Sequence, residues 1–329
     1  MIKRLVFFLL ITVFSNTAGF SSRYFIQFKD KNNSPFSVTN PSDYLSAKAI
    51  QRRTNQNIQI TDSDLPVNPF YIDSVRAMGA SILNATKWLN GVTVDCDSLT
   101  FQNIQTLSFV DSGRQIMRLS APKENKKKKF PETIPLLSNQ GMMRVSNLDY
   151  GNSFNQIHLM NGEYLHNNGF MGDGMTVAVL DAGFYSVDSL EAFDSLRAHS
   201  RILGTWDFVA NESSVYEDNS HGMQVLSCMA GNLPGQLVGT SPDASFWLLR
   251  SEDVATEYII EEYNWVSAAE FADSVGADII SSSLGYSTFD DSASSHTYAD
   301  MDGNTTPSSI GADFAASKGM LVICSAGNN

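Results

Sequence analysis

Four short apolar runs in the second half of the chain constrain its fold more than any other feature of the sequence. They cover residues 176–180, 245–249, 277–281 and 320–324. Stretches with helical spacing separate the runs, among them residues 221–230, 257–275 and 308–318. Strands that are continuously apolar are buried on both faces, which is typical of a parallel sheet covered by helices. We therefore predict a doubly wound α/β domain over residues 146–329.

Residues 20–120 show a different pattern. The spacing predicts strands at 24–29, 81–83, 91–96 and 109–117, and helices at 69–78 and 97–105. The order strand–helix–strand–strand–helix–strand is the ferredoxin-like arrangement. A further helix is expected at 43–53. Since this small α+β domain gathers no set of acid, base and nucleophile, we expect a binding or folding module.

The first 19 residues have the layout of a secretory signal peptide. Lys3 and Arg4 precede an apolar run at 5–14, and small or polar residues follow at 15–19. Ten apolar residues are too few to cross a hydrocarbon core of about 30 Å, so a membrane anchor is the weaker alternative. We expect a secreted protein with no membrane contact after signal removal. Its three cysteines are expected to be buried free thiols.

Charge is divided unevenly along the chain. Residues 20–140 hold 15 Lys and Arg against 10 Asp and Glu, whereas residues 141–329 hold 5 against 25. The net charge of −13 argues against nucleic acid as a partner. A lysine run, Lys126–Lys129, lies within a linker predicted at 121–145; it is a candidate processing site or a plain charged loop. Opposite charges favour docking of the two halves on each other.

Three polar residues are expected at the edge of the predicted parallel sheet where catalytic groups usually lie. Asp181 follows the first apolar run, His221 begins a helix, and Asn328 follows the last run. Catalytic groups of such sheets lie beyond the carboxyl ends of the strands. Taken singly, each residue is more often a cap or a turn residue than a catalytic one. Their joint occurrence is what points to a site.

These positions, in this order, resemble the sequence blocks of the subtilases, the subtilisin-like serine peptidases. The blocks are AVLDAGF (178–184), NSHGMQVLSCMAG (219–231), SSSLGY (281–286) and LVICSAGNN (321–329). The resemblance implies a subtilisin-like sheet and a secreted serine endopeptidase that acts on protein or peptide substrates. The signal, the small domain and the linker resemble the inhibitor-type propeptide of secreted bacterial subtilases. The first half is thereby implied to be an intramolecular inhibitor.

The resemblance also implies roles for individual residues. His221 would be the general base, and Asp181 would orient it and stabilise its protonated form. The side-chain amide of Asn328 would donate to the oxyanion of the tetrahedral intermediate. The backbone of Ser283, Leu284 and Gly285 would pair with an extended substrate as an added strand.

The chain departs from the family pattern in three respects. Ala182 stands where the family has Ser or Thr, and Met223 stands where it has Thr. The family's Gly-Thr-Ser block, which carries the nucleophile, does not occur within the 329 residues. We therefore expect the nucleophile beyond residue 329, in a chain truncated before it and inactive alone. The alternatives are a catalytically dead subtilase-like binding or chaperone protein, or a first half retained to recruit substrate.

No cofactor is required by this chemistry, and no metal ligand is assigned. Residues 300–304 place two carboxylates and an amide in a glycine-containing loop, so calcium is left open without a site. The adjacent Glu261 and Glu262 are expected to form a solvated acidic face.

Overall fold

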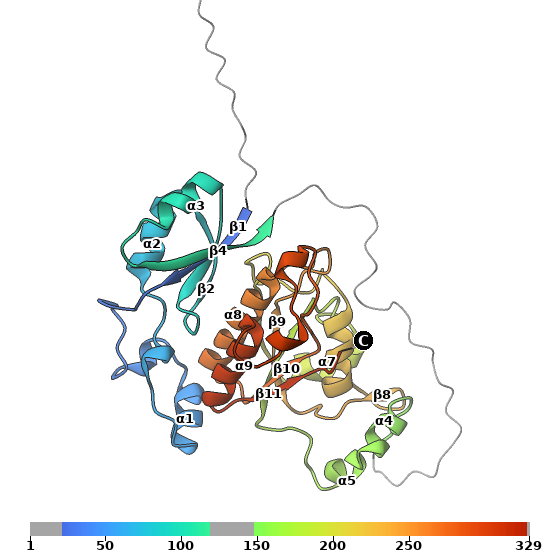
Figure 1. Ribbon diagram of the computed structural model, residues 1–329. Helices are drawn as coiled ribbons and strands as arrows, with labels where there is room; N and C mark the ends of the chain where they lie inside the picture. The colour runs from blue at the N-terminus through green and yellow to red at the C-terminus, as the bar shows by residue number, and fades with distance from the viewer. Residues whose placement is uncertain (1–21, 119–147, 328–329) are drawn as a thin grey trace, which may run out of the picture.

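The computed structural model describes residues 22–118 and 148–327, which form two units in contact with each other (Figure 1). The predicted signal peptide, the linker at 121–145 and Asn328 lie outside the described residues. The domain boundaries drawn through those segments stay a prediction. No helix within the described ranges is long and apolar enough to span a membrane.

The N-terminal unit is a four-stranded antiparallel sheet with helices. Its strands are β1 (Ser22–Phe28), β2 (Ser81–Thr86), β3 (Gly91–Cys96) and β4 (Val110–Arg118). Its helices are α1 (Ala47–Asn55), α2 (Pro69–Ala77) and α3 (Ser98–Ile104). The strand order is β2-β3-β1-β4, which is the predicted ferredoxin-like arrangement.

Local sequence explains where these helices begin. The Asp97 side chain accepts hydrogen bonds from the backbone of Leu99 and Thr100, which caps α3. Asn68 caps α2 in the same way, with Pro69 in the first turn. Helix α1 begins four residues later than predicted, because Pro41–Asp43 forms a separate 3-10 turn before it.

The second unit is a five-stranded parallel sheet. Its strands are β5 (Thr176–Asp181), β6 (Ile202–Asp207), β9 (Ser245–Arg250), β10 (Ile279–Ser282) and β11 (Leu321–Cys324). Their order is β11-β10-β5-β9-β6. A small hairpin joins β7 (Asn232–Leu233) to β8 (Leu237–Val238). The helices are α4 (Phe154–Leu159), α5 (Gly162–Asn167), α6 (Asp194–Ala198), α7 (His221–Ala230), α8 (Ile260–Val275) and α9 (Pro307–Ser317). The predicted doubly wound α/β fold is confirmed.

Helices cover both faces of this sheet. Val177 and Val179 of β5 pack into a core that includes Leu226 and Ala230 of α7. The alternating residues Ala178 and Leu180 pack into a second core, built with α8 and α9. Side chains that alternate between two apolar layers explain why the strand sequences are continuously apolar.

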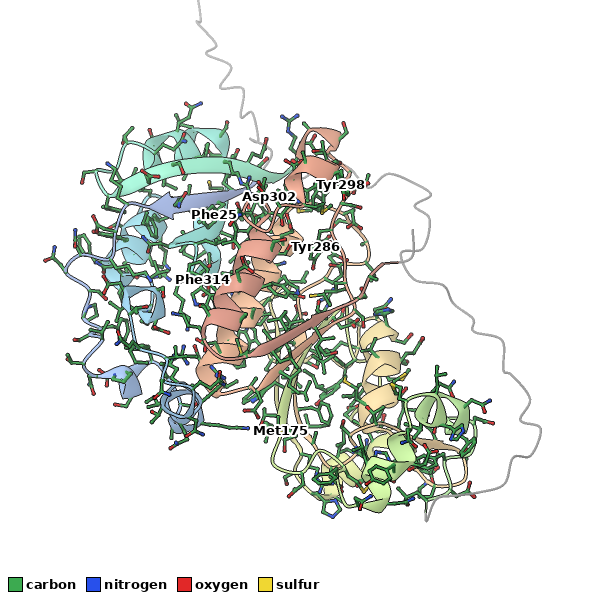
Figure 2. The ribbon with its side chains drawn as sticks, turned by 60° about the horizontal axis from the view of Figure 1, so that its bottom comes forward. Phe25, Met175, Tyr286, Tyr298, Asp302 and Phe314 are labelled. Carbon is green, nitrogen blue, oxygen red and sulfur yellow. The ribbon has the colours of Figure 1, made fainter. Side chains whose placement is uncertain are left out.

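Helices α8 and α9 also form the boundary with the N-terminal unit. Figure 2 labels Phe25 of β1 and Phe314 of α9, which lie on opposite sides of this boundary. The Phe25 ring contacts the Tyr263 ring, with centroids 4.4 Å apart, and Phe314 stacks on Trp88 at 5.7 Å. One face of the N-terminal sheet is therefore packed against helices α8 and α9 of the second unit.

Two local predictions were wrong. Glu261 and Glu262 are fully buried rather than solvated, because other segments of the second unit cover them: the Thr256 hydroxyl donates to Glu261, and His296 and the Ser308 hydroxyl contact the Glu262 carboxylate. Of the cysteines, Cys96 is buried, but Cys228 and Cys324 are exposed.

Candidate active site

Asp181 is the last residue of β5, the central strand of the sheet. Its side chain is fully buried, and its Oδ1 accepts a hydrogen bond from the backbone N–H of Ala182 at 2.7 Å. The backbone N–H of Ser251 donates to the Asp181 carbonyl at 3.0 Å, which ties the ends of β5 and β9 together. A carboxylate is thus held rigidly at the carboxyl edge of the sheet.

His221 is the first residue of α7, and it faces this carboxylate. Its Nδ1 lies 2.6 Å from Oδ1 of Asp181. The side-chain oxygen of Asn219 accepts the backbone N–H of His221 at 2.8 Å, which fixes the start of the helix. Since an ionised carboxylate only accepts, Nδ1 is the donor in this contact. The imidazole is 20% exposed, so a substrate has access to it.

The environment of Asp181 has one unusual feature. Its Oδ2 is buried and has no hydrogen-bond partner among the described residues. Burial raises the pKa of Asp181 above its usual range, although the hydrogen bonds from His221 and Ala182 counteract part of this rise. Ala182 has no hydroxyl to offer, so the departure noted in the sequence coincides with the atom that lacks a donor.

Two glycines allow the His221 helix to approach β5 closely. A Cβ on Gly222 would lie 2.5 Å from the Gly183 carbonyl oxygen and 2.8 Å from Cβ of Asp181. Gly183 has φ +144°, and a Cβ there would meet the backbone of Asn219 at 2.6 Å. The glycines that follow the Asp and the His in the sequence are therefore required for the 2.6 Å contact.

Residues 283–285 extend from β10, the neighbour of β5. Ser282 pairs with Leu180 across these two strands, so the segment begins beside the Asp181 end. Leu284 is buried, and its carbonyl accepts the Ser325 hydroxyl at 3.2 Å. Because successive residues of an extended segment face opposite sides, the backbone groups of Ser283 and Gly285 face away from Ser325. A Cβ on Gly285 would meet nothing within 4 Å.

Sequence reasoning missed a group of carboxylates beside this segment. Carboxylate oxygens of Glu252, Glu257 and Glu261 lie within 4.8 Å of one another. Tyr286 is close to them: burial, followed by Glu261, raises the pKa of its hydroxyl well above the usual value. Each glutamate occurs in an acidic stretch of ordinary appearance, so no local pattern indicates that the fold brings them together.

The carboxylates at 300–304 accept hydrogen bonds from residues of their own loop. Oδ1 of Asp302 accepts the backbone N–H groups of Asn304 and Thr305, at 2.8 and 2.9 Å. The Asp300 carboxylate accepts the backbone N–H and hydroxyl of Thr297. Figure 2 shows Asp302 in the exposed segment between β10 and α9, which also carries Tyr298. Within residues 22–118 and 148–327, the Glu252, Glu257 and Glu261 group alone offers three oxygen ligands suited to a cation.

Comparison with protein families matches two segments of the chain. Residues 23–132 match the peptidase S8 propeptide domain of Bacteroidota. Residues 172–329 match the subtilase family. The division between the two matches agrees with the two units of the structure.

Curated relatives resemble the second unit. Subtilisin E of Bacillus subtilis (strain 168) is 29% identical over 167 residues, which cover 50% of this chain and 37% of that protein. A thermostable alkaline protease of Halalkalibacterium halodurans is 31% identical over 133 residues, 40% of this chain and 33% of the relative. The chain thus spans well under half the length of these two relatives.

Solved structures resemble both units together. Fervidolysin from Fervidobacterium pennivorans, a keratinolytic enzyme related to subtilisin, aligns with a TM-score of 0.51 and 13% identity, over 94% of this chain and 40% of that one. The S393A mutant of the epidermin leader peptide processing serine protease of Staphylococcus aureus aligns with a TM-score of 0.51 and 12% identity. This alignment covers 94% of this chain and 61% of that one. At such identities the likeness concerns the fold. It is the two family matches that assign the chain to the subtilase family, with a peptidase S8 propeptide domain at residues 23–132 in front of the subtilase segment at 172–329.

Proposed function

We propose that the chain is the N-terminal part of a secreted serine endopeptidase that uses Asp181 and His221 as its acid–base pair. The observation that carries this proposal is the 2.6 Å contact between His221 Nδ1 and Asp181 Oδ1. Because Nδ1 faces Asp181, Nε2 is the ring nitrogen that would accept a proton from a serine hydroxyl as that hydroxyl attacks a peptide carbonyl. The protonated imidazole, stabilised by Asp181, then donates its proton to the leaving amine.

Other groups would hold the substrate and the developing charge. The side-chain amide of Asn328 would donate to the oxyanion, an interaction worth about 3–4 kcal/mol in subtilisin, the reference case for this effect. The backbone of Ser283 and Gly285 would pair with the substrate on the side away from Ser325. This chemistry needs only protein side chains, so no cofactor is assigned to it, and any calcium would have a structural role.

We propose that the nucleophilic serine comes from sequence beyond residue 329. The match to subtilisin E supports this, since it covers 37% of the length of that relative. The 329-residue chain alone would then be inactive, because removal of the nucleophile abolishes nearly all triad-dependent catalysis. The N-terminal unit would act as an intramolecular inhibitor, and the basic and apolar residues at 3–14 would direct secretion.

The test compares the 329-residue chain with the product of the complete reading frame that contains it. Both are assayed on a fluorescent casein derivative, the longer product also as Asp181→Asn and His221→Ala. We expect hydrolysis only by the longer product, with at least a 1,000-fold loss in His221→Ala. A stop codon directly after codon 329, or a longer product that does not hydrolyse casein, would instead favour a catalytically dead binding protein. Hydrolysis unaffected by both substitutions would refute Asp181 and His221 as the acid–base pair.

A further inference from the structure

The C-terminal ends of α8 and α9 meet at the boundary between the two units (Figure 1). The last carbonyls of a helix have no partner within the helix and carry partial negative charge. Three carbonyl oxygens at these ends converge on one point: that of Asp273 in the last turn of α8, which also accepts the Gly276 N–H, that of Ala277 two residues beyond α8, and that of Lys318 directly after α9. The ends of two helices thus create a concentrated set of acceptors on the surface of the second unit.

The guanidinium group of Arg52, from α1 of the N-terminal unit, occupies this point. Its Nε donates to the Lys318 carbonyl at 3.0 Å, and its Nη1 donates to the Ala277 carbonyl. Its Nη2 donates to the Asp273 carboxylate at 2.5 Å and to the Asp273 carbonyl at 3.3 Å. All three nitrogens therefore donate, to acceptors that lie around the edge of the guanidinium plane.

The Asp273 carboxylate also binds two neighbouring cations. Arg53 Nη2 and Lys87 Nζ each lie 2.9 Å from it, and both belong to the N-terminal unit. Burial raises the pKa of Asp273, but Lys87, Arg53 and Arg52 outweigh burial and leave the pKa below its usual range. Asp273 is fully buried, and Arg52 is 6% exposed. A buried charge of this kind is stable only when it is fully paired.

We propose that the junction of the α8 and α9 ends is a guanidinium-binding site, and that it is the determinant by which the peptidase domain recognises its propeptide. Every acceptor in the site belongs to residues 273–318, whereas the guanidinium comes from residue 52. A lysine ammonium has one nitrogen and cannot reach acceptors that are spread around the edge of a planar group with three nitrogens, so the site selects arginine. This inference concerns recognition between the units and is tested without peptidase activity.

After the propeptide leaves, the guanidinium-binding site is open to another occupant. Departure of the N-terminal unit removes the donors from Asp273 and from the three carbonyls at once. The surface that remains is acidic and shaped for a planar cation. Its occupant would then be Arg52 of an N-terminal unit released from a second copy, since Arg53 and Lys87 of that unit also fit the Asp273 carboxylate.

The experiment uses the full chain with a sequence-specific protease site in place of residues 126–132. After cleavage there, dilution gives the dissociation constant of the two units by size exclusion or fluorescence. We expect Arg52→Ala to raise this constant at least 100-fold and Arg52→Lys at least tenfold. The matched control is Arg76→Ala, because Arg76 is an exposed arginine of the same unit whose ion pair among the described residues is with its helix neighbour Asp73. Its dissociation constant should stay within twofold of the unsubstituted chain.

Chemical rescue separates a guanidinium site from a merely structural role. In Arg52→Ala, 20 mM methylguanidinium should lower the dissociation constant at least threefold, whereas 20 mM methylammonium should not. Equal effects of the two ions, or an Arg52→Ala constant within threefold of the unsubstituted chain, would overturn the proposal. If Arg52→Ala does not fold, Arg52→Lys decides: a tenfold or greater increase supports the site, and a smaller one refutes it.

Discussion

Substitution of Gly222 by alanine tests whether close packing creates the Asp181–His221 contact. The new Cβ would lie 2.5 Å from the Gly183 carbonyl oxygen, whereas ordinary contacts begin at 3.4 Å. The start of α7 must therefore move away from β5 by about 0.9 Å. A displacement of that size would stretch the 2.6 Å contact between His221 and Asp181 beyond hydrogen-bonding distance.

The expected cost follows from this overlap. Forcing one extra methyl group into a packed site costs about 1–3 kcal/mol. The gain in helix propensity from Gly to Ala offsets little of this, because Gly222 is only the second residue of the helix. In the complete enzyme, a shift near 1 Å at the base would lower kcat about 100-fold.

Two measurements on the 329-residue chain check the prediction. Urea unfolding gives the loss of stability, and proton NMR detects the downfield Nδ1–H signal of His221, which should disappear in Gly222→Ala. Gly285→Ala is the control for stability and signal, since nothing lies within 4 Å of its new Cβ. A Gly222→Ala variant with unchanged stability and a retained Nδ1–H signal would refute the packing argument.

Three further predictions concern Gly285 and Ala182 of the candidate site and Glu270 of α8. Gly285→Ala should leave the free energy of unfolding unchanged but lower kcat/KM of the complete enzyme at least tenfold, because the methyl group would project into the space for substrate. Unchanged kinetics would count against residues 283–285 as the segment that pairs with substrate. Ala182→Ser should stabilise the chain by about 1 kcal/mol at pH 7, since the hydroxyl can donate to Oδ2 of Asp181, and urea unfolding that shows no gain would contradict this. Burial raises the pKa of Glu270 to about 6 from an ordinary 4.5, so its protonation stabilises the fold; this contribution is complete below pH 4.5 and is lost as the pH rises through 6. The free energy of unfolding, measured with urea, should fall between pH 4 and pH 7 by about 2 kcal/mol less in Glu270→Gln than in the unsubstituted chain. An identical pH dependence in the two chains would disprove the assignment.

The sequence was sufficient to predict the parallel sheet and the N-terminal sheet, because their strands have clear apolar patterns. It was not sufficient to predict β6: the strand Ile202–Asp207 lies at the sheet edge, and its residues are mostly half-exposed, so it lacks a continuous apolar run. Asp181 and His221 could be named because the blocks around them, at 178–184 and 219–231, resemble those of the subtilases, whereas neither residue stands out singly.

The polar face of α8 could not be predicted in the same way. Glu270 and Asp273 are separated by one turn and have the appearance of solvated residues in the sequence. Their partners, Lys87 and Arg52, are more than 180 residues away, and only the docked N-terminal unit brings them together. Tertiary contacts of this kind leave no local pattern.

The 266 residues that separate Arg52 from its Lys318 acceptor also bear on the order of folding. At a synthesis rate of about 5–20 residues per second, roughly 10–50 s pass between the appearance of the two. The N-terminal sheet has its own apolar core within residues 24–110 and can fold during that interval. Its two arginines then remain hydrated until the ends of α8 and α9 exist. Docking is therefore a late, high-contact-order step that follows two faster local ones.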